Sequence, residues 1–342
     1  MKPRYTLLTL LALLCWSCGK EDVLPADPAD REEENQPATY VNPVLNADVP
    51  DPTVLRADDG TFYAVGTGAN VFSSKDMMHW KRLGKAFREM PAWLTSERGK
   101  GYVWACDINR IGDRYVMYYA LSEWDELDLN GIGVAVADAP QGPYTDRGKL
   151  FLSNEIGVRN SIDPCYVEED GSKFLIWGSF HGLYIVELAE DGLSLRKDAK
   201  PVKVAGSAFE GVMLHKRGGA YFLFASVGSC CDGLNSTYRT VVGRSDHLFG
   251  PYLDRNGKRM LDNGYETVVA GCPSFKGTGH TAELMTDDAG KTWMLYHAYS
   301  VREPDKGRLL MLDEVRWDNE GWPYVSEGRP SATAVPGPVW NP

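Results

Sequence analysis

The chain has 342 residues, of which 43% are hydrophobic and 24% are charged. This balance is typical of a globular protein and excludes a wholly disordered chain. The formal net charge of −11 argues against DNA or RNA as a partner, because a nucleic acid requires a basic surface. A neutral substrate is compatible with this charge.

Residues 1–17 have the pattern of an export signal. Two basic residues near the start precede an apolar run over residues 7–14, which is too short to span a bilayer as a mature helix. Ser17 directly precedes Cys18, an arrangement that resembles the cleavage site of a bacterial lipoprotein. We therefore expect a lipoprotein signal peptide over residues 1–17 and lipidation of Cys18, with an ordinary secretory signal as the alternative.

Residues 18–38 are rich in Asp, Glu, Pro and Ala, which is typical of a flexible tether. The acidic stretch directly after Cys18 resembles a signal that sends bacterial lipoproteins to the cell surface. We expect an exported outer-membrane lipoprotein that faces either the surface or the periplasm. The N-terminal lipid is its only expected attachment to the membrane.

Five of the seven cysteines lie after residue 38: Cys106, Cys165, Cys230, Cys231 and Cys272. Their spacing fits no zinc-binding pattern. The odd number leaves at least one thiol unpaired within a monomer, which is the state expected for this chain. We predict that the adjacent Cys230 and Cys231 are buried packing thiols or that one long-range disulfide forms.

Strand-like runs with alternating aromatic residues recur after residue 39 and are separated by Gly, Asp and Asn turns. Each of five units consists of a strand, a tight turn and an aromatic strand. The units cover residues 53–65, 108–119, 166–177, 212–224 and 283–296. Two of the segments that follow them end in the related turns Gly142-Pro143-Tyr144 and Gly250-Pro251-Tyr252.

Repeats of about 40–50 residues with about four strands each are the signature of a β-propeller. We therefore predict an all-β fold, a five-bladed β-propeller over residues 39–342, with a generic β-sandwich as the alternative. Trp317 and Trp322 are expected to be structural residues of a hairpin that closes the last blade.

An ionisable residue stands just before the first strand of every unit. These residues are Asp51, Asp107, Asp163, Glu210 and His280. The first strand of each blade lines the central channel of a propeller, so we expect the five side chains to gather around one axis. Buried acids are costly because desolvation and mutual repulsion oppose their charge, which indicates a functional role. For Asp107 we expect only a hydrogen bond to a neighbouring blade or a strand cap.

At these positions the sequence resembles glycoside hydrolase family 43, whose members are inverting enzymes built on a five-bladed propeller. The resemblance rests on Asp51-Pro52, Ile162-Asp163-Pro164 and Ala208-Phe209-Glu210-Gly211. It implies that Asp51 is the general base and that Glu210 is the general acid, on opposite faces of the sugar. It also implies that Asp163 raises the pKa of Glu210 and orients the acid and the sugar.

Later motifs resemble the arabinan endo-1,5-α-L-arabinosidases of this family. They are Ser229-Cys230-Cys231, Ser236-Thr237-Tyr238 and Gly279-His280-Thr281. The resemblance implies an inverting hydrolase that acts on α-L-arabinan or another arabinose-containing plant polysaccharide. An exo-acting α-L-arabinofuranosidase, a β-xylosidase or another furanosidase of the family remains an alternative. A surface propeller that binds glycans without catalysis is a second alternative.

The resemblance also implies a ligand set for an ion and for the sugar. His280 is expected to help hold a calcium ion, mostly through water molecules, because a hard cation prefers oxygen ligands. No organic cofactor is expected. By this resemblance Arg308 is expected to contact a sugar hydroxyl. Independently of the resemblance, Trp104 and Phe180 are expected to contact the sugar, since aromatic faces stack on sugar rings; for both, packing between blades is the alternative.

Overall fold

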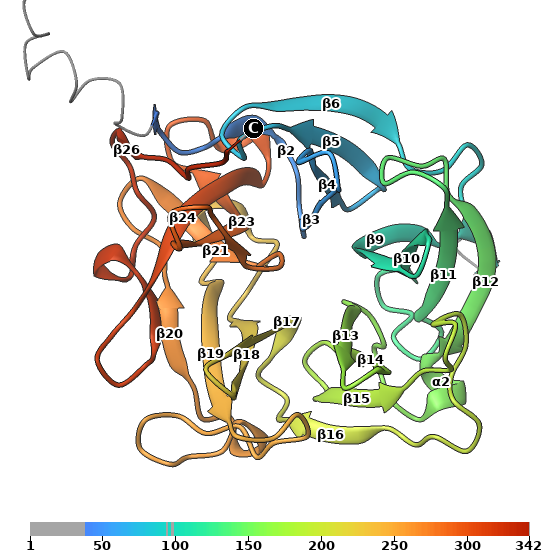
Figure 1. Cartoon of the computed structure of the whole chain (residues 1–342). Coiled ribbons are helices and arrows are strands. Elements are labelled where there is room, and N and C mark those ends of the chain that lie inside the picture. Colours follow the sequence, from blue (N-terminus) through green and yellow to red (C-terminus); the bar gives the residue numbers. More distant parts are fainter. Residues whose placement is uncertain (1–37, 94, 97–98, 342) are drawn as a thin grey trace, which may run out of the picture. The chain divides into compact units, whose positions relative to one another are not determined.

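The computed structural model describes residues 38–93, 95–96 and 99–341, and these residues form an almost purely β structure (Figure 1). The signal predicted for residues 1–17, the lipidation of Cys18 and the tether up to residue 37 lie outside the described residues. The described helices are all short: α2 (Ser153–Ile156), η2 (Gly233–Asn235), η3 (Met260–Asp262), η4 (Pro304–Lys306) and η5 (Ser326–Gly328). None of these helices is long and apolar enough to cross a membrane.

Three sheets contain four strands each, and the strands of each sheet follow chain order. Group 1 consists of β3 (Thr53–Arg56), β4 (Phe62–Gly66), β5 (Asn70–Ser74) and β6 (Trp80–Lys85). Group 2 consists of β9 (Tyr102–Ile111), β10 (Arg114–Ser122), β11 (Gly131–Ala137) and β12 (Thr145–Leu152). Group 3 consists of β13 (Cys165–Glu169), β14 (Ser172–Trp177), β15 (Leu183–Glu187) and β16 (Val202–Ala205). In Figure 1 the first strand of each group lies toward a common centre and the fourth lies outside.

Two further groups belong to one ten-stranded sheet. Group 4 consists of β17 (Glu210–Arg217), β18 (Ala220–Val227), β19 (Arg239–Ser245) and β20 (Glu266–Val269). Group 5 consists of β22 (Met285–Thr286), β23 (Thr292–Ser300), β24 (Leu309–Trp317) and β25 (Pro323–Val325). The strand β21 (Phe275–Gly279) joins the two groups, because it pairs in parallel with β19 and antiparallel with β23.

Strands from the two ends of the described chain pair with each other. The strand β2 (Leu45–Asp48) pairs with β24 and so adds an early segment to the last group. The strand β1 (Thr39–Tyr40) pairs with β26 (Val335–Pro336). A separate short hairpin consists of β7 (Thr95–Ser96) and β8 (Gly99–Lys100).

All five predicted strand–turn–strand units are antiparallel hairpins. The fifth unit differs from the others, since its first strand, β22, has only two residues. Each of the two Gly-Pro-Tyr turns contains the same kind of hydrogen bond. The hydroxyl of Tyr144 in one turn, and of Tyr252 in the other, donates to the backbone carbonyl four residues earlier. The hairpin predicted between Trp317 and Trp322 is present, and it joins β24 to β25.

Apolar side chains fill the spaces between successive groups. They form five buried clusters, each of which combines residues of two neighbouring groups, including groups 5 and 1. Tyr118 and Trp177 belong to the cluster between groups 2 and 3, and Phe62 and Leu312 to the cluster between groups 1 and 5. Burial contributes about 25 cal/mol for each Å² of apolar surface, so this packing is what fixes the inner strands relative to one another.

A polar cluster links the inner strands of several groups. Asp107 lies inside β9 and not before it, which corrects the sequence prediction. Its carboxylate accepts a hydrogen bond from the backbone N–H of Tyr166 in group 3 and lies 3.3 Å from the Thr53 hydroxyl in group 1. Glu283 lies 3.1 Å from the same hydroxyl, accepts the backbone N–H of Val54 and shares a hydrogen bond with Asp107. Asp107 therefore connects neighbouring groups, as expected.

The proximity of the two carboxyl groups makes the stability of the fold depend on pH. Burial of the Glu283 carboxyl group, followed by the negative charge of Asp107, raises the pKa of Glu283 well above its usual range. The folded chain thus holds a proton that the unfolded chain releases. The contribution of Glu283 to stability is complete below its unfolded pKa and is lost as the pH rises through its folded pKa.

We predict that Glu283→Gln reduces this loss of stability at high pH. Glutamine keeps an oxygen acceptor for Val54 and offers an N–H donor to Asp107, and it has no proton to release. Urea unfolding between about pH 5 and pH 9 should show a steeper fall of the midpoint for the wild type than for the variant. Glu190→Gln, at an exposed position, should keep the wild-type slope. Equal slopes for all three proteins would contradict the prediction.

Candidate active site

The site residues predicted for the body of the chain line one cavity of about 320 Å³. They are Asp51, Trp104, Asp163, Phe180, Glu210, His280 and Arg308. This volume is within the usual range of about 300–1,000 Å³ for ligand pockets. A larger hollow near residues 138–146 is lined by none of these residues, so it is not a candidate for the predicted active site.

Three of the polar residues share an uncommon backbone conformation. Asp51, Asp163 and His280 have φ angles of 53°, 58° and 51°, in the left-handed region. Such residues cost about 1–3 kcal/mol each and persist only where the surrounding structure holds them. Two positions differ from the sequence prediction, because Glu210 is the first residue of β17 and His280 directly follows β21.

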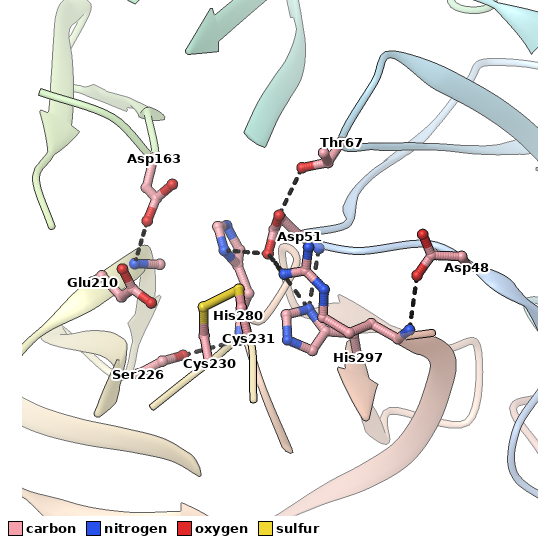
Figure 2. A network of polar contacts seen from close by, with 12 residues as sticks. Asp48, Asp51, Thr67, Asp163, Glu210, Ser226, Cys230, Cys231, His280 and His297 are labelled. Carbon is pink, nitrogen blue, oxygen red and sulfur yellow. Dashed lines mark hydrogen bonds and ion pairs between the residues drawn. A yellow bond between two sulfur atoms is a disulfide. The ribbon is translucent and has the colours of Figure 1, made fainter. Parts of the chain in front are cut away.

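Asp51 is surrounded by hydrogen-bond donors (Figure 2). Its Oδ2 accepts a hydrogen bond of 2.6 Å from the Thr67 hydroxyl, and its Oδ1 accepts one of 2.9 Å from Arg308 Nη1. His280 Nδ1 lies 3.3 Å from the same Oδ1. Burial by itself would raise the pKa of Asp51, but Arg308 and His280 outweigh burial and hold that pKa well below its usual range. Asp51 is therefore ionised and can accept a proton.

Glu210 has the opposite environment. Its side chain is buried, and its Oε2 accepts a hydrogen bond of 2.7 Å from the Ser179 hydroxyl. Burial, followed by the negative charge of Asp163, raises the pKa of Glu210 to about 7. Glu210 therefore keeps its proton up to neutral pH and can donate it.

Asp163 lies beside Glu210 in Figure 2 and is fixed by the main chain. Its Oδ2 accepts a hydrogen bond of 3.0 Å from the backbone N–H of Gly211, the residue after Glu210. Burial raises the pKa of Asp163 to about 6, and the negative charge of Asp51 adds to this rise. A cavity that holds one carboxyl group ionised and another protonated can perform general base and general acid chemistry together.

Two histidines contact Asp51, namely His280, which lines the cavity, and His297, which is buried behind it. His297 Nδ1 accepts the backbone N–H of Asp51 at 3.1 Å, so the proton of the neutral ring resides on Nε2. Burial, and then the charge of Arg308, lower the pKa of His297 well below its usual range. Burial alone would lower the pKa of His280, but its contact with Asp51 and the charge of Asp163 raise it to about 8.

The residues near His280 do not form a direct calcium site. Calcium takes about 6–8 oxygen ligands, whereas His280 supplies a nitrogen and its Nδ1 faces Asp51 Oδ1. Among the described residues, no three His, Cys, Asp or Glu side chains are grouped so that they could hold a metal. An ion at His280 would need water for most of its ligands.

Aromatic side chains form another part of the cavity wall. Trp104 in β9 packs against Trp124 with 4.7 Å between ring centroids. Trp124 is 64% exposed, and Phe180 is 37% exposed, so both present ring surface to solvent. All three residues line the cavity, which is the position expected for Trp104 and Phe180.

The cysteine prediction was wrong for Cys230 and Cys231, which form a disulfide with each other. Both residues lie in the loop between β18 and β19, and both line the cavity rather than a hydrophobic core. Their sulfur atoms therefore have each other as partners. Cys106, Cys165 and Cys272 are free and buried.

Several contacts of the site were not predicted from the sequence. Thr67 and Ser179 position the two key carboxyl groups, but each is a short polar residue in a turn and belongs to no recognisable motif. The contact of His297 with Asp51 was not predicted either. The place of this histidine in the aromatic strand β23, opposite group 1, becomes informative only when the two groups are seen together.

Comparison with known proteins identifies the family of this chain. The profile of the family described as Glycosyl hydrolases family 43 matches residues 40–323. The extracellular exo-α-(1→5)-L-arabinofuranosidase of Cellvibrio japonicus is 31% identical, over 94% of this chain and 92% of that protein. The extracellular endo-α-(1→5)-L-arabinanase 1 of Bacillus subtilis is 30% identical, over 80% of this chain and 86% of that protein.

The solved structures agree with the sequence relatives. The α-L-arabinanase of Cellvibrio cellulosa in complex with arabinohexaose has a TM-score of 0.74 and 30% sequence identity. The match covers 82% of this chain and 96% of that chain. An exo-1,5-α-L-arabinanase from a bovine ruminal metagenomic library has a TM-score of 0.72 and 30% identity, with 81% and 96% covered.

The coupling between Asp163 and Glu210 can be measured without any ligand. We predict that Asp163→Asn lowers the pKa of Glu210 below its value of about 7, because a neighbouring negative charge is removed. Ser179→Ala should shift the same pKa upward, since the hydroxyl stabilises the carboxylate. Carbon-13 NMR titration of labelled glutamate carboxyls, with Glu210→Gln for assignment, measures both shifts. Shifts of the same sign would contradict the prediction.

Proposed function

Because the chain belongs to glycosyl hydrolases family 43, it is an inverting glycoside hydrolase, and we propose that it cleaves the α-1,5 bonds of L-arabinan. The observation that carries this proposal is the pair of carboxyl groups in one cavity, with Asp51 held ionised and Glu210 held protonated up to about pH 7. The names of the relatives support arabinan as the substrate, since they include an arabinofuranosidase and arabinanases.

We also propose that groups 1–5 are the blades of a closed five-bladed β-propeller. Two features support closure of the ring. The early strand β2 pairs with β24 in the last group, and an apolar cluster lies between groups 5 and 1 as it does between the other neighbours. In this architecture the first strands converge on one axis, which accounts for a cavity lined by residues of all five groups.

The proposed reaction is a single displacement. Asp51 accepts a proton from a water molecule while the water oxygen attacks the anomeric carbon. Glu210 donates its proton to the glycosidic oxygen as the bond to that oxygen breaks. Attack from the face opposite the leaving group inverts the configuration at the anomeric carbon, and both carboxyl groups then exchange protons with solvent.

The neighbours of the two carboxyl groups have separate roles in this proposal. Arg308 keeps Asp51 ionised and offers further N–H donors to a sugar hydroxyl. Asp163 keeps Glu210 protonated through its charge. Trp104 and Phe180 offer ring faces to the apolar side of a sugar. The calcium ion expected at His280 stays a prediction.

Both endo and exo action have support among the relatives. The endo-acting arabinanase of Bacillus subtilis and the exo-acting arabinofuranosidase of Cellvibrio japonicus match this chain at similar identity. Early release of long oligomers from linear 1,5-arabinan would identify endo action, and release of arabinose alone would identify exo action. Because these relatives are named extracellular, we propose that this protein is exported, and the lipid anchor at Cys18 stays a prediction.

We predict that Glu210→Gln lowers turnover of linear 1,5-arabinan by about 10²–10⁴-fold, the usual contribution of a general acid. Hydrolysis of aryl glycosides should fall much less, because a good leaving group departs without a proton. Chromatography of the products measures the first rate, and release of the phenol measures the second. NMR of the first anomer formed by the wild type tests inversion. Unchanged arabinan turnover in the variant would refute the assignment of the acid.

The pKa values also predict the pH profile of kcat/KM. Activity requires ionised Asp51 and protonated Glu210, so it should fall below the low pKa of Asp51 and above about pH 7. Arg308→Ala should raise the pKa of Asp51, move the acidic limb to higher pH and leave the alkaline limb in place. Initial rates across the pH range measure both limbs. An alkaline limb that moves by as much as the acidic limb would contradict these roles.

A further inference from the structure

We propose that the Cys230–Cys231 disulfide is a sugar-contacting part of the cavity wall that contributes to the affinity for glycan, an inference that rests on the proposed function. Both cysteines line the same cavity as Asp51, Glu210 and His280. In the view of Figure 2 the bond between Cys230 and Cys231 lies between the side chains of Glu210 and His280. Cys231 is exposed and Cys230 is half-buried, so a ligand in the cavity can reach the sulfur atoms.

The disulfide does little to hold the fold together. It joins residues one position apart, and the stabilisation by a disulfide arises mainly from the length of the loop that it closes. The loop has its own fixed base. The Ser229 N–H donates to the Thr237 hydroxyl, and the Ser236 hydroxyl donates to the Ser229 carbonyl. A role in stability therefore does not explain the bond.

The ends of the loop lie at His280 and at Glu210, the proposed general acid. Ser226, at the end of β18, accepts the backbone N–H of His280 at 2.8 Å. Tyr238, directly before β19, shares a hydrogen bond with Glu210. The cysteines stand between these two anchor points, so the disulfide is fixed on the side of the cavity that carries the general acid.

The chemistry of the bond suits the apolar face of a sugar ring. A disulfide between adjacent residues closes a small ring that includes their shared peptide, so neither side chain keeps its rotamer freedom. The sulfur atoms are soft and polarisable and, unlike thiols, carry no hydrogen to donate. Together with the aromatic side chains from groups 2 and 3, the bond lines the cavity with rigid apolar surface from different blades. Such preorganised surface gains affinity because little entropy is lost on binding.

The wall can be removed chemically without any substitution. A water-soluble phosphine reduces the S–S bond to two thiols, while the phosphine takes up the oxygen of one water molecule and becomes its oxide. Free rotation of two thiol side chains then replaces the fixed surface. The other three cysteines of the described body are thiols already, so the treatment changes this bond alone among the described residues.

The experiment measures binding of arabinohexaose to the Glu210→Gln protein by titration calorimetry, before and after reduction. We expect reduction to raise the Kd about tenfold, the change produced by a loss of roughly 1.4 kcal/mol. The matched control adds Cys230→Ser and Cys231→Ser, and it should bind as weakly as the reduced protein and show no response to phosphine. The melting temperature should stay nearly the same in all forms.

The outcomes separate this inference from the proposed function. Absence of arabinohexaose binding to the oxidised Glu210→Gln protein would overturn the proposed function, and the inference with it. Tight binding that is equal before and after complete reduction, checked by mass, would overturn the sugar-contacting role alone. A large fall in melting temperature on reduction would also overturn it, because the bond would then be a structural staple.

Discussion

The ion pair between Arg308 and Asp51 joins residues 257 positions apart and links the last strand group to the first. The same two regions are joined by the pairing of β2 with β24 and by the apolar cluster between groups 5 and 1. The protonation state of the proposed base therefore depends on the contact between the first and last groups. The chain must therefore bring its first and last groups together before Asp51 has the ion-pair partner that keeps it ionised.

A buried ion pair is weak evidence for stability, since the desolvation of both charges offsets much of their attraction. The Arg308–Asp51 pair is better understood through the contrast with Glu210, which lies in the same cavity and forms no ion pair with any of the described residues. Hydrogen-bond donors surround the carboxyl group of Asp51, whereas the carboxyl group of Asp163 lies beside that of Glu210. The pKa values of two carboxyl groups with nearly the same chemistry are thereby shifted in opposite directions, as their proposed roles require.

Much of the fold and most of the candidate site could be predicted from the sequence, because both follow from repetition. Equivalent positions in repeats converge in space. For this reason Asp51, Asp163, Glu210 and His280 could be predicted to lie together although they are far apart in the chain, and they line one cavity. The prediction failed where contacts depend on individual turns. Adjacency of two cysteines does not reveal a bond between them, and nothing in the sequence identifies Glu283 as the partner of Asp107.

The pairing of β1 with β26 and of β2 with β24 also determines how the body would carry a mechanical load. A pull on the chain before residue 38 reaches these two short ladders before any strand that bears a proposed catalytic group. The force passes into the C-terminal segment and the last group, where Asp48, the last residue of β2, accepts the backbone N–H of Arg308 in the cavity wall. The contact between Arg308 and Asp51 would therefore be kept under such a pull for as long as these two ladders stay paired.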